Sequence, residues 1–220
     1  MDVIEGEKII VQSLIGGSKL SFYIRCLKSL LSSCQDSFVL QLHTDGSISQ
    51  EDKDAIHLEL DGTTVTFTDS SENTNRVLDY LQSRPNCQKF RKDSIWGIEF
   101  FDPIFAFPDD PISFYLDADI LFLRPFSGLF DRKQVKNGAI FIKDTQWDAY
   151  SFRPWQMLIG KNKAQTVKGI TTGLVFWDKA AIDWDYLEWF LGENRLHKIP
   201  EWIMPTAQAG LAHRCEAKTI

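Results

Sequence analysis

Cysteine patterns that mark disulfide-rich and zinc-binding proteins are missing from this sequence. The four cysteines (Cys26, Cys34, Cys87 and Cys215) include no Cys-x-x-Cys spacing. Neither a disulfide framework nor a zinc site is therefore expected. We interpret all four as reduced thiols, and Cys26 lies in an apolar helical stripe, where a small buried side chain fits.

Long apolar runs are also missing. No stretch approaches the roughly 20 apolar residues that a membrane-spanning helix needs. The N-terminus carries Asp2, Glu5 and Glu7, whereas a signal peptide begins with basic residues and a longer apolar core. The sequence therefore predicts a cytoplasmic protein without a transmembrane segment, and any membrane contact is expected to be peripheral.

Positive charge is in the minority. The 24 lysines and arginines are outnumbered by 30 acidic residues, which gives a formal net charge of −6. Proteins that bind nucleic acid usually show a basic stripe, so no nucleic-acid partner is expected. This balance still permits a local basic pocket for a nucleoside diphosphate. With 220 residues, 44% of them hydrophobic, the chain is expected to form a soluble domain with a sizeable core.

Short apolar runs alternate with helical patterns along the chain. Strands are expected at residues 8–15, 38–42, 63–67, 112–116, 139–142 and 174–177, with residues 120–123 as a second apolar piece. Helical patterns cover residues 22–31, 50–58, most of 72–107 with a break at Pro85, and 184–191. The alternation predicts an α/β fold, in which a mostly parallel central sheet carries helices on both faces.

Two carboxylates interrupt the most apolar of these strands. Asp117 and Asp119 stand inside the run ISFYLDADILFL of residues 112–123. Residues i and i+2 of a strand point to the same face, so both carboxylates can converge on one point. Without a cation they would repel each other. Because Mg²⁺ and Mn²⁺ prefer carboxylate and phosphate oxygens, the pair predicts a divalent metal site. A turn that merely carries two acidic residues is the alternative.

Three segments together resemble the GT-A class of nucleotide-sugar glycosyltransferases, whose fold is Rossmann-like. FYLDADILFLRPF at 114–126 is similar to their DxD strand, and HTDGS at 43–47 to the acidic turn after their second strand. GITTGLVFWD at 169–178 resembles a later segment beside the sugar and acceptor. The resemblance implies metal-assisted transfer of a sugar from a nucleotide-diphosphate sugar to a carbohydrate, lipid or protein acceptor.

The same resemblance implies roles for single residues. Asp119 would bind Mn²⁺ or Mg²⁺, and Asp117 would contact the ribose, the metal or a metal-bound water. Asp45 would read the nucleobase. Further contacts to the bound nucleotide sugar are expected from Ile15, Thr172 and Gly173.

One GT-A-like domain is expected over residues 1–220. Residues 1–119 would form the nucleotide-sugar-binding half and residues 120–220 the acceptor-side half. Many metal-dependent relatives take a third metal ligand from a later histidine. His213 is the nearest candidate, although packing or solvent exposure is its more ordinary role. Because no obvious equivalent follows, the acceptor-side half is expected to be incomplete.

A basic side chain that binds the diphosphate is expected in the segment KFRK at 89–92. Arg91 and Lys92 are the candidates, and a solvated basic face is the alternative. Relatives carry a lysine just ahead of an apolar-Phe-Asp segment, whereas this sequence has Glu99 there.

An inverting transferase also needs a carboxylate base on the acceptor side. Asp178 is our candidate for this catalytic role, while Asp144 and Asp148 are equally placed by sequence. Trp147 and Trp155 are the candidates for an acceptor-binding surface.

Two other functions stay open. An apolar run followed by DxD also begins the haloacid-dehalogenase phosphatases, but these place it on their first strand and follow it with a Gly-Thr-type turn. A non-catalytic nucleotide- or sugar-binding module derived from a transferase would account for Glu99 and for the missing third ligand.

Overall fold

The computed structural model describes residues 8–145, 165–193 and 199–220. The strands of the sheet are β1 (Ile10–Ile15), β2 (Val39–Thr44), β3 (Val65–Asp69), β4 (Ile112–Leu116), β5 (Ala139–Lys143), β6 (Ile170–Asp178) and β7 (Lys218–Thr219). The helices are α1 (Leu20–Ser33), α2 (Gln50–Glu59), α3 (Ser70–Tyr80), α4 (Pro85–Asp93), α5 (Ile95–Phe105), α6 (Arg132–Val135), α8 (Trp184–Gly192) and α9 (Ile203–Arg214).

The sheet has the order β3-β2-β1-β4-β6-β5-β7. β1 is parallel to both β2 and β4, β2 is parallel to β3, and β5 is parallel to β7. β6 runs antiparallel to its neighbours β4 and β5. The expected α/β fold with a mostly parallel central sheet is thus confirmed. The strand order reverses between β1 and β4, and in such sheets this switch point is where ligands bind.

Local sequence signals account for several element boundaries. Ser49 begins α2 with a capping box, in which its side chain and that of Asp52 each accept a hydrogen bond from the other's backbone N–H. Pro85 stands at the start of α4, where the missing N–H costs no helical hydrogen bond. The predicted break in the helical region at Pro85 is therefore confirmed.

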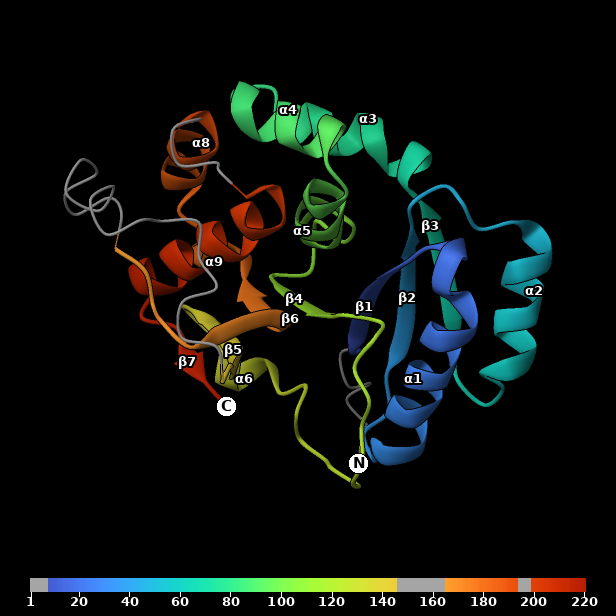
Figure 1. The fold of residues 1–220 in the computed structure, drawn as a ribbon. Coiled ribbons are helices and arrows are strands. Elements are labelled where there is room, and N and C mark those ends of the chain that lie inside the picture. Colours follow the sequence, from blue (N-terminus) through green and yellow to red (C-terminus); the bar gives the residue numbers. More distant parts are fainter. Residues whose placement is uncertain (1–7, 146–164, 194–198) are drawn as a thin grey trace, which may run out of the picture.

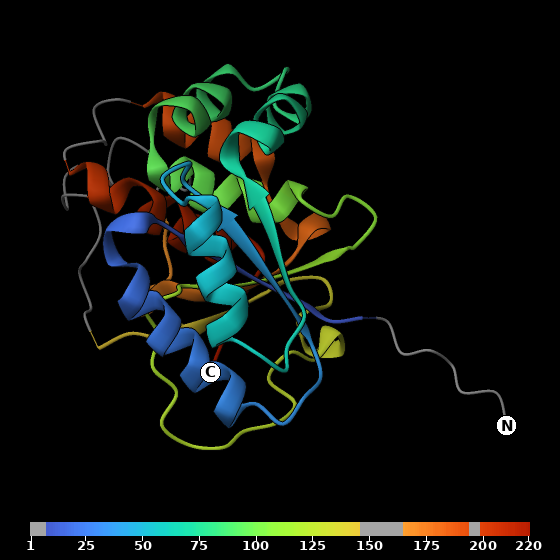
Figure 2. The same cartoon turned by 90° about the vertical axis from the view of Figure 1, so that its right-hand side faces the viewer.

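Helices cover both faces of the sheet (Figure 1). On one face α5 contacts β1 and β4, α9 contacts β6, and α3, α4 and α8 pack against these two helices or each other. On the other face α1 and α2 lie side by side in front of β1 to β3 (Figure 2). Phe130 and the segment that follows β4 cover the remaining part of that face. The sheet is thereby shielded from water on both sides, as a parallel sheet requires.

The second apolar piece after Asp119 does not continue the strand. β4 ends at Leu116, and the Ile120 N–H donates to the Asp117 carbonyl at 3.3 Å, which closes a turn. Leu121 and Leu123 are largely exposed. The apolar residues alone suggested a longer strand, but beyond Leu116 the ladder with β6 has no further pairs.

Two further expectations concern the chain as a whole. All four cysteines are free thiols. No helix in the described part of the chain is long and apolar enough to cross a bilayer.

A network of buried polar side chains lies between β1, β2 and α5. The Gln12 side-chain amide donates to the Pro103 carbonyl at 3.0 Å and to Ser113 Oγ at 3.0 Å. Gln12 Oε1 accepts from His43 Nε2 at 3.0 Å. Burial, with smaller contributions from Arg76 and Arg91, lowers the pKa of His43 to about 3. The imidazole is therefore neutral in the folded protein at neutral pH.

His43 should make the fold sensitive to mild acid. The unfolded chain takes up the His43 proton below pH 6.5, while the folded chain does not do so until about pH 3. Stability is thus lost as the pH falls through this window. Between pH 7 and pH 5 the loss from this group should be about 2 kcal/mol. Urea denaturation of the wild type and of His43→Gln at both pH values measures it. An equal loss in both proteins would contradict this account.

Candidate functional site

A cleft of about 380 Å³ opens at the carboxyl ends of β1 and β4, at the switch point of the sheet. Side chains from β1 and its following turn, from α1, from the turn after β2, from α5 and from the end of β4 form its walls. The lining residues are Leu14, Ile15, Gly16, Ser18, Lys19, Tyr23, Asp45, Ile95, Trp96, Glu99, Tyr115, Asp117, Ala118 and Asp119.

The DxD carboxylates both line this cleft. Asp117 is the first residue after β4, and Asp119 lies two residues on in the turn that follows. Asp119 is exposed, whereas Asp117 is mostly covered. Their charges also reach α1, because Asp119, Asp45 and Asp117 all raise the pKa of Tyr23 in addition to its burial. The acidic turn after β2 and the DxD turn therefore face the same part of α1.

Asp117 is fixed by its neighbours on two strands. Tyr115 donates its hydroxyl to Asp117 Oδ1 at 3.0 Å. The Asp117 backbone N–H donates to the Gly173 carbonyl at 2.7 Å. Burial raises the pKa of the Asp117 carboxyl, the Tyr115 hydrogen bond opposes this rise, and the charge of Asp119 adds to it. The charge of Asp119 thus makes ionisation of Asp117 more costly, and a cation bound between the two carboxylates would offset this cost.

Gly173 lies directly against this carboxylate. A Cβ at Gly173 would stand 3.3 Å from Asp117 Oδ2, so a glycine leaves room for the close approach of the two strands. Thr172, the preceding residue on β6, is half-buried and does not line the cleft. Of the two site residues expected from the segment at 169–178, Gly173 therefore lies next to Asp117, whereas Thr172 does not line the cleft.

Asp45 and Ile15 also line the cleft. Asp45 Oδ1 accepts from the Ser47 N–H at 2.9 Å, and Ser47 Oγ accepts from the Gly17 N–H at 2.8 Å. These bonds tie the turn after β2 to the turn after β1. Gly16 permits the contact, because any Cβ there would collide with the Asp45 carboxylate.

The basic candidates Arg91 and Lys92 do not line the cleft. The Arg91 guanidinium is buried and grips Asp102, with Nη2 2.8 Å from Oδ2. This is a bidentate pair inside the helical layer. Lys92 is exposed near the end of α4. Sequence could not separate the two cases, since the KFRK run is equally compatible with a buried pair and a solvated face.

Asp178 lies at the other end of the sheet. It pairs with Ile112 at the start of β4, whereas Leu174 pairs with Leu116 beside the cleft. Four residues of strand, about 13 Å, separate these two positions. The Asp178 carboxylate accepts from the N–H groups of Asn137 and Ala180, at 2.8 and 3.1 Å, and so caps a turn. Its position does not support a role as base at this cleft, and the antiparallel course of β6 is the reason.

The remaining candidates also lie away from the cleft. Asp144 follows β5 at the cleft's end of the sheet but does not line the cleft. His213 on α9 is exposed and pairs with Gln165 Oε1 at 2.8 Å. Asp148, Trp147 and Trp155 lie outside the described residues.

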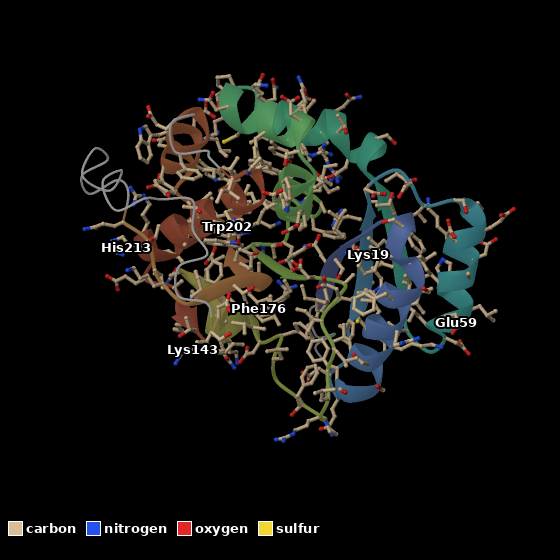
Figure 3. The ribbon with its side chains drawn as sticks, in the orientation of Figure 1. Lys19, Glu59, Lys143, Phe176, Trp202 and His213 are labelled. Atoms are coloured by element: carbon tan, nitrogen blue, oxygen red, sulfur yellow. The ribbon has the colours of Figure 1, made fainter. Side chains whose placement is uncertain are left out.

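Sequence reasoning missed other residues of the cleft. Tyr115 was assigned only to an apolar strand, although its place two residues before Asp117 puts it on the same face. Lys19 stands at the start of α1 and lies between α1 and α5 in Figure 3. The sequence has Glu99 where the resemblance implies a lysine, and in the structure Glu99 lines the cleft. Burial, followed by the charges of Asp117 and Asp119, raises the pKa of Glu99.

The carboxylate oxygens of Asp117 and Asp119 are suitable ligands for a hard divalent cation that also binds phosphate oxygens of a substrate. Among the residues that the structure describes, no three His, Cys, Asp or Glu side chains gather as a complete metal site. Mg²⁺ is commonly held by only one or two carboxylates together with phosphate oxygens of a substrate. Asp117 and Asp119, at a cleft with room for such a substrate, match that arrangement.

Replacing Gly16 tests how the acidic turn is held. Gly16→Ala should push the Asp45 carboxylate away from Ser47 and lower the melting temperature by no more than about 4 °C, because a flexible side chain can yield. The Ser47 amide resonance, which reports the 2.9 Å bond to Asp45, should shift. Gly138→Ala is the control, since its Cβ would make only an ordinary 3.5 Å contact. An unchanged Ser47 resonance in Gly16→Ala would refute this view of the turn.

No family model matches the chain, and no curated protein is significantly similar to it in sequence. Solved structures are similar in fold. Mouse xyloside xylosyltransferase 1 superposes with a TM-score of 0.62 at 14% identity, covering 97% of this chain and 84% of the other.

Two fungal enzymes give comparable superpositions. The mannosyltransferase Ktr4p of S. cerevisiae, in complex with GDP, has a TM-score of 0.62 at 13% identity and covers 94% of this chain and 66% of that one. Core-mannan synthase A of Aspergillus fumigatus, in an Mn/GDP form, has a TM-score of 0.53 at 10% identity and covers 96% and 67%. The chain therefore has the fold of the GT-A glycosyltransferases, as the resemblance of its segments implied.

Proposed function

We propose that this chain is a glycosyltransferase that moves a sugar from a nucleotide-diphosphate sugar to a carbohydrate, lipid or protein acceptor, with Mn²⁺ or Mg²⁺ as the metal. The observation that carries the proposal is the meeting of both DxD carboxylates in one cleft at the β1–β4 switch point. The GDP and Mn/GDP complexes of proteins with this fold support the choice of ligand.

The walls of the cleft suit the parts of such a donor. Asp45, on the turn after β2, would accept hydrogen bonds from the nucleobase, and Ile15 would give it an apolar contact. Asp117 and Asp119 would hold the cation. When bound, the cation neutralises the charge that gathers on the departing diphosphate. Tyr115 and the Gly173 carbonyl keep Asp117 in place, so this carboxylate needs little rearrangement when the ligand arrives.

The reaction exchanges one bond for another. The bond between the anomeric carbon and the diphosphate oxygen breaks, and its electron pair stays on the diphosphate. An acceptor hydroxyl forms the new bond to that carbon, and its proton passes to the departing diphosphate or to water. Asp117 and Asp119 at the end of β4 would hold the cation, whose positive charge would supply the main stabilisation of the diphosphate.

A nucleotide-binding module without turnover is the second candidate. Glu99 favours it, because an acidic side chain lines the cleft where the resemblance implies a lysine. The two candidates differ in one measurement. Slow hydrolysis of a bound nucleotide-diphosphate sugar, which transferases often show without acceptor, would favour the enzyme, whereas tight binding of the intact donor would favour the module.

Removal of the exposed carboxylate tests the proposed metal site. Asp119→Ala should lose at least about 100-fold of donor hydrolysis or transfer, because the cation is no longer held and catalytic electrostatics of this kind are worth 10²–10³. Its melting temperature should stay near that of the wild type, since Asp119 is exposed.

Asp54→Ala is the matched control, an exposed aspartate on α2 far from the cleft. The release of nucleoside diphosphate from GDP- and UDP-linked sugars in Mn²⁺ is the measurement. Full activity of Asp119→Ala would overturn the assignment of the metal site.

A further inference from the structure

The cleft carries a strongly uneven set of charges. Four carboxylates line it, those of Asp45, Glu99, Asp117 and Asp119. The only basic side chain among its described lining residues is Lys19. Burial raises the pKa of Glu99 to about 8, so this side chain is largely uncharged at neutral pH. A single divalent cation would offset the two DxD carboxylates and leave Asp45, together with any charge on the ligand. An anionic ligand therefore has one cationic group of the protein to use here.

Lys19 is held where it can serve this purpose. It ends the short turn Gly17–Lys19 between β1 and α1, and the Gly17 N–H is tied to Ser47 Oγ at 2.8 Å. The turn therefore fixes the backbone, while the side chain is exposed and free to extend. Lys19 and the α1 residue Tyr23 both line the cleft. The carboxylates of both acidic turns contribute to the raised pKa of Tyr23, after its burial.

Several other cations in the described part of the chain are engaged in ion pairs. Lys28 pairs with Glu59, Lys53 with Asp69 and Lys89 with Asp93. Arg91 is buried against Asp102, and Arg132 pairs with Asp110. Lys19 forms no ion pair with any described residue, although four carboxylates line the same cleft.

We infer that Lys19 is the residue that binds the diphosphate of the nucleotide ligand, on the side of the cleft opposite the DxD turn. This inference rests on the proposed function. A lysine supplies a mobile point charge with three donors on a flexible stem, which suits phosphate oxygens whose position the metal already fixes. The diphosphate would then lie between the cation at Asp117 and Asp119 and the ammonium of Lys19. The cationic contact that the KFRK segment was expected to give comes instead from the turn after β1.

Calorimetric titration of the full chain in Mn²⁺ tests this inference. The probes are GDP and UDP, with guanosine and uridine as the matching ligands without phosphate. Lys19→Ala should bind the better diphosphate about 10- to 100-fold more weakly than the wild type, as expected for a lost hydrogen bond between charged groups. Its affinity for the matching nucleoside should be unchanged. Lys19→Arg should restore most of the loss, because the charge is kept.

Lys28→Ala is the control, since Lys28 is an exposed lysine of α1 that does not line the cleft. It should bind both kinds of probe like the wild type, and all variants should keep the wild-type melting temperature. If the wild type binds a diphosphate and Lys19→Ala binds it equally well, the inference is overturned and the proposed function stands. An equal loss for nucleoside and diphosphate would also overturn it. If the wild type binds neither diphosphate, both proposals fall.

Discussion

The position of one carboxylate governs this site. Asp117 is the first residue beyond β4, where its backbone is bound by the Gly173 carbonyl of β6 and its side chain by the Tyr115 hydroxyl. β4 lies between the parallel strand β1 and the antiparallel strand β6. Asp117 follows the carboxyl end of β4 and therefore lies at the switch point of the sheet. Burial makes its negative charge costly, and Asp119 adds to that cost. A cation between the two carboxylates would offset that cost.

Two glycines leave room for the acidic turns that line the cleft. Gly173 and Gly16 lack the side chains that would press on Asp117 and Asp45, so two acidic turns from distant parts of the sequence can line one cleft. Helix α5 closes the cleft with Trp96 and Glu99. The bond between Gly17 and Ser47 fixes the turn that presents Lys19. The cleft therefore carries the two DxD carboxylates and one lysine, a set of side chains that would match a nucleoside diphosphate with a divalent cation.

Local patterns predicted the fold well, because each strand and helix is set by its own period, caps and prolines. The capping box at Ser49 and the helix start at Pro85 are examples. The DxD pair could also be recognised, since charge inside an apolar run needs a reason. The positions of residues that depend on how distant segments pack could not be predicted in this way. The position of Asp178 away from the cleft could not be predicted, because sequence does not reveal that β6 runs antiparallel to β4. The burial of Arg91 could not be predicted either, because its partner Asp102 is known only once α4 and α5 have packed. Lys19 carried no local signal beyond two preceding glycines.

The central claim is that the cation lies between the two carboxylates of the DxD turn and joins the protein to a diphosphate. Anomalous diffraction from crystals grown with Mn²⁺ and GDP or UDP locates the ion directly. The account predicts a manganese peak within coordination distance of carboxylate oxygens of Asp117 or Asp119 and of the diphosphate. A nucleotide bound in the cleft with no manganese at these carboxylates, or manganese bound at another place on the chain, would contradict it.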